Sequence, residues 1–153
     1  MKPLRWCVTV LLMIVFCLIA PITFAGESDN EVIGYTRLGV DQSGESYFEK
    51  ETINVNIWPS GLAMVSLEEP SEGVRFFKAK PGWEMLELHH APKRQYLLVL
   101  QGILEIHTSK NEIKQFEPGS ILLVEDTYGK GHRTRNASTQ NLILVWVGVE
   151  KDQ

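Results

Sequence analysis

The chain has 153 residues, of which 44% are hydrophobic, and its formal net charge at pH 7 is −4. A chain of this length and composition can bury the core of one domain. The negative charge argues against a nucleic-acid-binding protein, because contacts to phosphate need a basic face.

The first 25 residues have the layout of a secretory signal peptide. Lys2 and Arg5 precede an apolar run over residues 8–20, and Ala25 is the small residue before a polar stretch. This order predicts cleavage after Ala25 and export to the periplasm or the medium. The alternative is an uncleaved segment that anchors the protein, although the run is shorter than the roughly 20 residues of a membrane span.

Cleavage would change the chemistry available to the mature chain. Cys7 and Cys17 are the two cysteines of the sequence, and both lie in the segment to be removed. The mature protein would then have neither a disulfide nor a reactive thiolate. Removal of Lys2 and Arg5 would leave 13 basic residues against 19 acidic ones, a net charge of −6.

Residues 26–153 are expected to form one domain of short strands. The predicted strands cover residues 32–40, 53–57, 62–67, 74–79, 83–90, 95–100, 103–107, 113–116, 120–124, 132–136 and 141–149. Turn residues separate them at intervals of about 8–12 residues, as at Pro59-Ser60-Gly61. No run has the pattern of a long helix, so the sequence predicts an all-β sandwich or barrel of the jelly-roll type.

Two blocks anchored by glycines carry histidines close to turns. The first block runs from Gly82 to Gly102 and contains the adjacent pair His89 and His90, followed by Gln95. Side chains alternate across a strand, so His89 and His90 point to opposite faces and only one of them can share a cavity with another histidine.

The second block ends with Gly129, His132 and Asn136. If His132 faces the interior of a barrel, Thr134 and Asn136 face it as well, because each is two residues further along the strand. A neutral imidazole beside these polar side chains suits a metal or an anionic ligand. The alternative is a structural histidine that is hydrogen-bonded beneath the loop of residues 129–131.

These blocks resemble the two motifs of the cupin superfamily. The first motif has Gln95 where the family has Glu, and its paired-histidine place is filled either by Leu88 with His90 or by His89 with Ala91. The stretch from Leu88 to Pro92 resembles the pattern Trp-His-x-Ala-Pro, which is frequent in a group of small single-domain cupins with no settled activity. His89 takes the histidine place of this pattern, and Leu88 stands where the pattern has Trp. The resemblance implies a double-stranded β-helix barrel over residues 26–153 and a homodimer as the usual assembly.

The resemblance also implies a metal site in the barrel mouth. One of His89 and His90, together with Gln95 and His132, would hold a divalent ion, and Thr134 and Asn136 would line the ligand space. Neutral ligands leave the full charge on the ion, which would draw an anionic small molecule. Gln95 has the alternative role of a buried amide that bonds the backbone near Pro92.

Other polar residues have a plainer interpretation. His107, at the end of a predicted strand, is expected at the surface, and the paired carboxylates Glu125 and Asp126 are expected to be solvated in a loop. Trp83 and the row Leu142, Leu144 and Trp146 are expected in the core or on a dimer face.

The sequence therefore predicts an exported cupin that binds a small molecule in the barrel mouth, with a divalent metal of undetermined identity as a candidate cofactor. Two alternatives stay open, namely a metal-free module for a sugar or a small acid, and a structural or interaction domain with a filled barrel. Whether the protein is an enzyme is not decided by the residues.

Overall fold

The computed structural model describes residues 32–57 and 63–150, and within them the chain forms β-strands joined by turns, without a helix. The predicted signal peptide over residues 1–25 and the predicted turn at residues 59–61 lie outside the described residues and stay predictions. Over the described ranges, no helix could cross a membrane.

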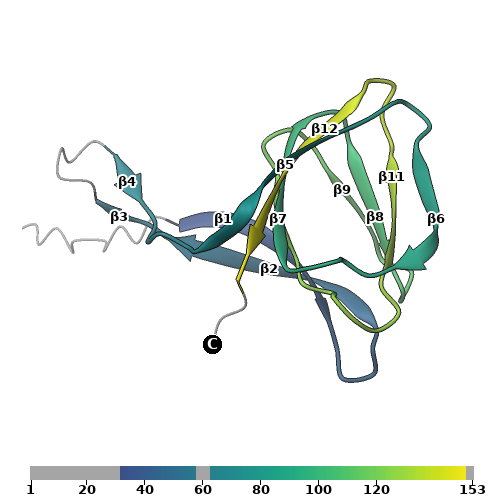
Figure 1. The fold of residues 1–153 in the computed structure, drawn as a ribbon, viewed down its shortest axis with the longest axis horizontal. Helices are drawn as coiled ribbons and strands as arrows, with labels where there is room; N and C mark the ends of the chain where they lie inside the picture. The colour runs from purple at the N-terminus through teal and green to yellow at the C-terminus, as the bar shows by residue number, and fades with distance from the viewer. Residues whose placement is uncertain (1–31, 58–62, 151–153) are drawn as a thin grey trace, which may run out of the picture.

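Two sheets form the barrel (Figure 1). The six-stranded sheet contains, in spatial order, β2 (Ser46–Asn54), β1 (Val32–Val40), β10 (Ile121–Val124), β7 (Gln95–Gln101), β12 (Leu142–Val149) and β5 (Ser71–Ala79). The four-stranded sheet contains β6 (Glu84–His89), β11 (His132–Asn136), β8 (Leu104–Thr108) and β9 (Ile113–Phe116). Neighbouring strands are antiparallel except β1 and β10, which are parallel. The predicted all-β jelly-roll class is confirmed.

A β arm extends from the barrel. It consists of the outer part of the β1/β2 ribbon and of a small pair, β3 (Asn56–Ile57) and β4 (Met64–Val65), which lies at its far end (Figure 1). The sequence pattern did not predict this arm, because local alternation identifies strands but not how far a ribbon projects. β5 begins at Ser71, three residues before the predicted start, because pairing with Val149 of β12 extends the strand over a stretch of polar residues and glycine.

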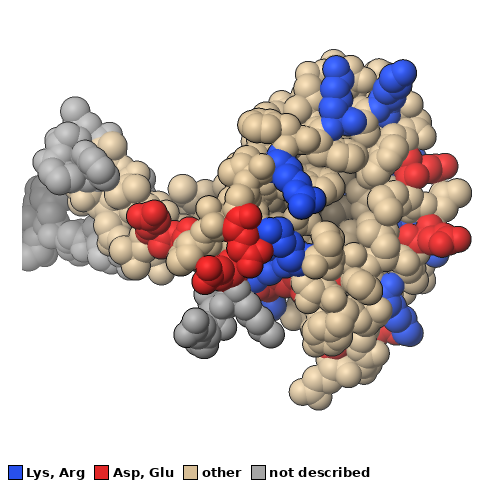
Figure 2. Space-filling view, in the orientation of Figure 1, with Lys and Arg blue, Asp and Glu red and all other residues tan. Residues whose placement is uncertain are grey.

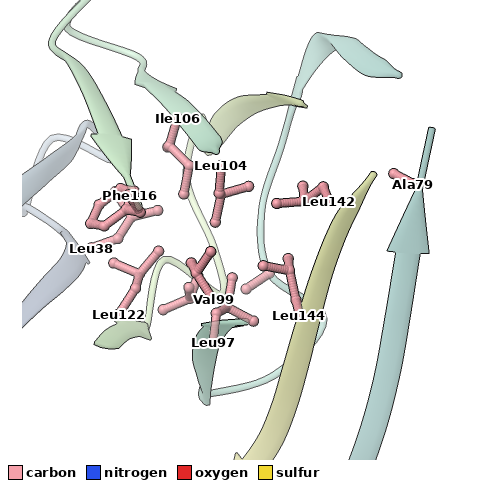
Figure 3. Close-up of a cluster of buried hydrophobic side chains, with 12 residues drawn as sticks. Leu38, Ala79, Leu97, Val99, Leu104, Ile106, Phe116, Leu122, Leu142 and Leu144 are labelled. Atoms are coloured by element: carbon pink, nitrogen blue, oxygen red, sulfur yellow. The ribbon is translucent and has the colours of Figure 1, made fainter. Parts of the chain in front are cut away.

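Aliphatic side chains from both sheets meet in one core (Figure 3). Leu104 and Ile106 of β8 are fully buried, as are Leu142 and Leu144 of β12. Each pair is two residues apart on its strand, so alternation places both members on the inner face. Burial of such side chains contributes about 25 cal/mol per Å² of apolar surface and is the main stabilising term of the barrel.

The row Leu142, Leu144 and Trp146 therefore belongs to the interior and not to a dimer face. The large apolar side chains exposed nearby are Val74 and Phe76, which are 56% and 79% exposed on the edge strand β5. The homodimer stays a prediction.

Charged side chains lie mostly at the surface in mixed groups. Figure 2 shows acidic and basic side chains next to each other on the displayed face. Arg94 contacts Glu69 at 2.9 Å and Glu125 at 2.6 Å, and Arg37 pairs with Glu125 at 3.3 Å. Ion pairs of this partly exposed kind contribute roughly 0–1 kcal/mol each, so the fold does not depend on them.

Candidate functional site

A pocket of about 220 Å³ lies between the two sheets, against the apolar core. Its lining is Phe77, Trp83, Met85, His89, Ala91, Pro92, Gln95, Leu97, Leu104, Val124, His132, Thr134, Leu144 and Trp146. Most of these side chains are apolar, and the polar ones come from β6, β7 and β11. The barrel interior is therefore not completely filled by its own side chains.

Two histidines lie side by side in this pocket. His89 of β6 and His132 of β11 are paired in the strand register, and their ring centroids are 4.6 Å apart. Residues directly opposite each other on antiparallel strands present their side chains on the same face, so the pairing brings the two rings together. The adjacent His90 is exposed and does not line the pocket.

An irregularity in the pairing of β6 with β11 shapes this end of the pocket. His132 pairs with His89, and Thr134 pairs with Met85. Between these two pairs the chain advances by two residues in β11 but by four residues in β6. The extra length forms a bulge in which Leu86 is 68% exposed. Bulges of this kind re-aim side chains, and here Met85 and His89 both line the pocket on either side of the bulge.

A buried carboxylate supports His132 from behind. Asp126 is completely buried, and its Oδ2 lies 2.6 Å from Nδ1 of His132. This corrects the expectation of a solvated Glu125–Asp126 pair, because only Glu125 reaches the surface ion pairs. An ionised carboxylate accepts a hydrogen bond from Nδ1–H, which leaves Nε2 of His132 as the nitrogen available to a ligand. The residue is only 6% exposed, so the ring has little freedom to turn away from this contact.

The loop between β10 and β11 holds Asp126 in place through backbone hydrogen bonds. Ala91 N donates to the carbonyl of Asp126 at 3.1 Å, and Lys130 N donates to the carbonyl of Gly44 at 2.8 Å. Gly131 has a φ of +75°, and a Cβ there would lie 2.6 Å from His90 N and closer still to the His89 carbonyl. Glycine is required at residue 131 because the loop backbone touches the strand that carries His89.

His89 is also held in a defined orientation. Its Nδ1 lies 3.2 Å from the carbonyl oxygen of Glu87, which directs the other ring nitrogen away from this contact. Burial lowers the pKa of His89, and the neighbouring His132 lowers it further. The ring is therefore biased toward the neutral form, which is the form that binds a metal or accepts a hydrogen bond.

Gln95 and Thr134 complete the polar part of the lining. Gln95 is 7% exposed, and no hydrogen bond joins its side chain to another described residue. The fully buried polar atoms that lack a partner among the described residues do not include those of Gln95, so its amide is accessible from the pocket. The amide of Gln95 is thus free to bond a molecule in the pocket, whereas the expected alternative, a bond to the backbone near Pro92, is not formed.

Asn136 does not line the pocket, which corrects the expectation that it would. Its Nδ2 donates to the carbonyl of Gln140 at 2.8 Å and to that of Lys80 at 3.2 Å. The side chain therefore fixes two loops at the end of the barrel, and its role in the motif is structural.

His107 lies outside this pocket, on the outer face of β8. Its Nε2 contacts Oε1 of Glu105 at 2.6 Å, and Arg135 Nε donates to the same oxygen at 2.6 Å. The guanidinium of Arg135 is the main cause that lowers the pKa of Glu105 to about 2. The side chain of His107 is 32% exposed, so it lies at the surface but is part of a charged cluster.

A cluster of three aromatic side chains forms another part of the pocket lining. Phe77 stacks on Trp146 with centroids 5.1 Å apart and planes inclined by 16°, and Trp83 meets Phe77 edge-on at 5.1 Å. Phe77 was not singled out from the sequence. Its alternation with the exposed Phe76 along β5 was the only available signal, and it did not show which face was inside.

The residues expected to bind a metal come together only in part. His89, His132 and Gln95 line one pocket, whereas His90 does not. In the part of the chain that the structure describes, no group of three or more His, Cys, Asp or Glu residues could hold a metal ion. Any ion here would depend on two imidazoles and one amide oxygen.

A double-sheet β-barrel with a histidine pair on neighbouring strands defines the class of this protein as a small barrel that resembles the cupins. No protein-family model matches the chain, and no curated protein matches it.

Several solved structures are similar to the chain, all at low identity. A sugar phosphate isomerase from a cupin superfamily of Silicibacter pomeroyi is 19% identical with a TM-score of 0.43, and the match covers 52% of this chain and 50% of that one. A cupin domain from Bordetella pertussis is 17% identical with a TM-score of 0.43, over 56% and 88%. A double-stranded β-helix protein from Klebsiella pneumoniae is 21% identical with a TM-score of 0.43, over 63% and 74%. The matched region spans only half of the isomerase, whose activity is a property of that protein.

Proposed function

We propose that the protein binds a small molecule in the barrel pocket and that His89 and His132 contact the polar group of this ligand. The observation that carries the proposal is the fully buried carboxylate of Asp126 on Nδ1 of His132. Orientation of a histidine by a buried carboxylate is typical of sites in which the other ring nitrogen binds a ligand or a metal, or moves a proton.

The lining indicates what kind of molecule fits. The walls are mainly aliphatic and aromatic, and the polar side chains His89, Gln95, His132 and Thr134 form the polar part of the lining. A sugar would bury several hydroxyl groups against apolar walls, and each buried hydroxyl without a partner costs roughly 1–3 kcal/mol. The pocket therefore favours a ligand with a compact apolar body and one polar head over a sugar.

The histidine pair could also perform acid–base chemistry on such a ligand. While its Nδ1–H donates a hydrogen bond to Asp126, His132 presents Nε2 as a hydrogen-bond acceptor. A ligand hydroxyl or an acidic C–H placed there could transfer a proton to Nε2, while the carboxylate stabilises the imidazolium that forms. The same residues would serve a binding protein without catalysis, and ligand binding is the function that both cases share.

A divalent metal is the second candidate occupant of the pocket. The Asp126–His132 pair favours it, because a histidine that binds a metal through one ring nitrogen usually donates a hydrogen bond from the other to a carboxylate. His89, His132 and Gln95 would hold the ion with neutral donors, and the ion would act as a Lewis acid toward the ligand. The usual catalytic site has three protein ligands of stronger donor character. The set present fits a weakly bound ion.

Replacement of His132 tests the proposed site. Trp83 and Trp146 line the pocket, so their fluorescence reports occupancy by small aromatic and branched carboxylic acids, with and without added Zn²⁺ or Mn²⁺. For a ligand found in this way, His132→Ala should weaken binding at least about tenfold, which corresponds to roughly 1.4 kcal/mol.

The matched control is His90→Ala, because His90 neighbours His89 but is exposed outside the pocket. It should bind the ligand like the wild type. Equal losses in both variants, or unchanged binding in a folded His132→Ala protein, would contradict the proposed site.

A further inference from the structure

A second hollow lies outside the barrel, along the β1/β2 ribbon. It has a volume of about 410 Å³, compared with about 220 Å³ for the barrel pocket. Its lining comes from β1 and β2 on one side and from β9 and the start of β10 on the other. Lys50 and Lys114 are its two basic residues.

Lys114 is held in a fixed position at this groove. Its Nζ lies 2.8 Å from Oγ1 of Thr36. The same ammonium group lies 5.8 Å from the ring centroid of Phe48 and 5.6 Å from that of Phe116. Two aromatic faces and a hydroxyl therefore orient the cation without neutralising it.

Lys50 lies next to this cation. Lys50 pairs with Thr36 in the register of β1 and β2, so the two side chains share a face of the ribbon. Glu49 and Glu51 are its neighbours in the chain, and both pair with Arg37. Glu51 also lines the groove, so it is the one carboxylate residue among the described lining residues, and its ion pair is with Arg37 rather than with either lysine. Among the residues that the structure describes, no carboxylate forms an ion pair with Lys50 or Lys114.

The electrostatic surroundings agree with this geometry. Burial lowers the pKa of Lys114, and the charge of Lys50 lowers it further. Two neighbouring cations without a counter-ion repel each other, and an anion placed between them would relieve the repulsion. The chain has more acidic than basic residues, so two neighbouring lysines without an ion-pair partner are unusual in it.

We propose that this groove binds a phosphate or sulfate group, either as the free ion or carried on a small organic molecule. Two ammonium groups match the charge of a divalent oxyanion, and lysine binds such groups as a compact point charge with rotatable donors. Hydroxyl groups of Thr36, Thr52 and Ser120 also line the groove and can donate hydrogen bonds. This proposal concerns a different site from the barrel pocket and does not depend on it.

The test is calorimetric titration of the purified protein with inorganic phosphate at fixed ionic strength, with sodium chloride as the reference salt. Constant ionic strength separates specific binding from general screening. Saturable binding of phosphate is expected, and Lys50→Gln and Lys114→Gln should each weaken it at least about tenfold. Lys50 is exposed, so its replacement tests the site even if Lys114→Gln reduces folding through the lost aromatic contacts.

Lys78→Gln is the charge-matched control, because Lys78 lies on β5, at the opposite edge of the six-stranded sheet from β2. It should leave phosphate binding unchanged. Phenyl phosphate distinguishes the two sources: tighter binding than inorganic phosphate supports an organic carrier, and equal binding supports the free ion. Phosphate heats no different from those of chloride, or an equal loss in Lys78→Gln, would overturn the proposal.

Discussion

Replacement of Gly131 by Ala should destabilise the protein by at least roughly 3 kcal/mol and separate the two pocket histidines. The added Cβ would press on the backbone at His89 and His90, where neither strand nor loop can move without breaking pairing. The positive φ of +75° adds further strain for a residue with a side chain. Urea unfolding followed by tryptophan fluorescence measures the loss, and weaker ligand binding should accompany it.

Gly82→Ala provides the matched control for this effect. Gly82 has a similar φ of +80°, but no atom lies within 4 Å of the position of its Cβ. Only the backbone strain of about 1–2 kcal/mol applies there. Equal destabilisation by the two substitutions would show that the loop does not press against β6 as described.

Asp126→Ala should lower the free energy of unfolding by about 3 kcal/mol. The substitution leaves Nδ1 of His132 buried without its acceptor and opens a small cavity beneath the ring. Ligand binding in the pocket should weaken as well, because the orientation of His132 is no longer fixed. The same urea unfolding experiment and the fluorescence titration measure both effects.

The adjacent carboxylate offers the control. Glu125 forms partly exposed ion pairs with Arg37 and Arg94, so Glu125→Ala should cost no more than about 1 kcal/mol and leave ligand binding intact. A smaller loss in Asp126→Ala than in Glu125→Ala would contradict the role assigned to the buried carboxylate.

The alternation of apolar residues and the placement of turns predicted most of the fold. Residues 95–100 and 141–149 are apolar enough to be recognised as interior strands, and both have a neighbouring strand on each side in the six-stranded sheet. The arm and the early start of β5 were not predictable, because they depend on pairing between distant strands. Local composition does not encode that pairing.

The candidate site was predictable where a motif fixes its register. The spacing of the glycines and histidines led to His132 and to one of His89 and His90, and the strand pairing places His89 beside His132. The burial of Asp126 is not predictable from the sequence, because a loop has no periodicity that separates a buried carboxylate from a solvated one. Its position six residues before His132, in a loop with two glycines, is the signal that a search for a histidine partner could have used.

The protonation state of the His132 ring is the most direct test of the proposed binding site. Long-range ¹H–¹⁵N correlation spectra of the protein, recorded in mildly alkaline buffer, distinguish a protonated from an unprotonated ring nitrogen. The buried carboxylate of Asp126 on Nδ1 predicts that Nδ1 carries the proton and that Nε2 is unprotonated, and that this pattern is lost in Asp126→Ala. A His132 ring protonated only at Nε2, or one unaffected by Asp126→Ala, would contradict the proposal that this histidine presents a free nitrogen to the pocket.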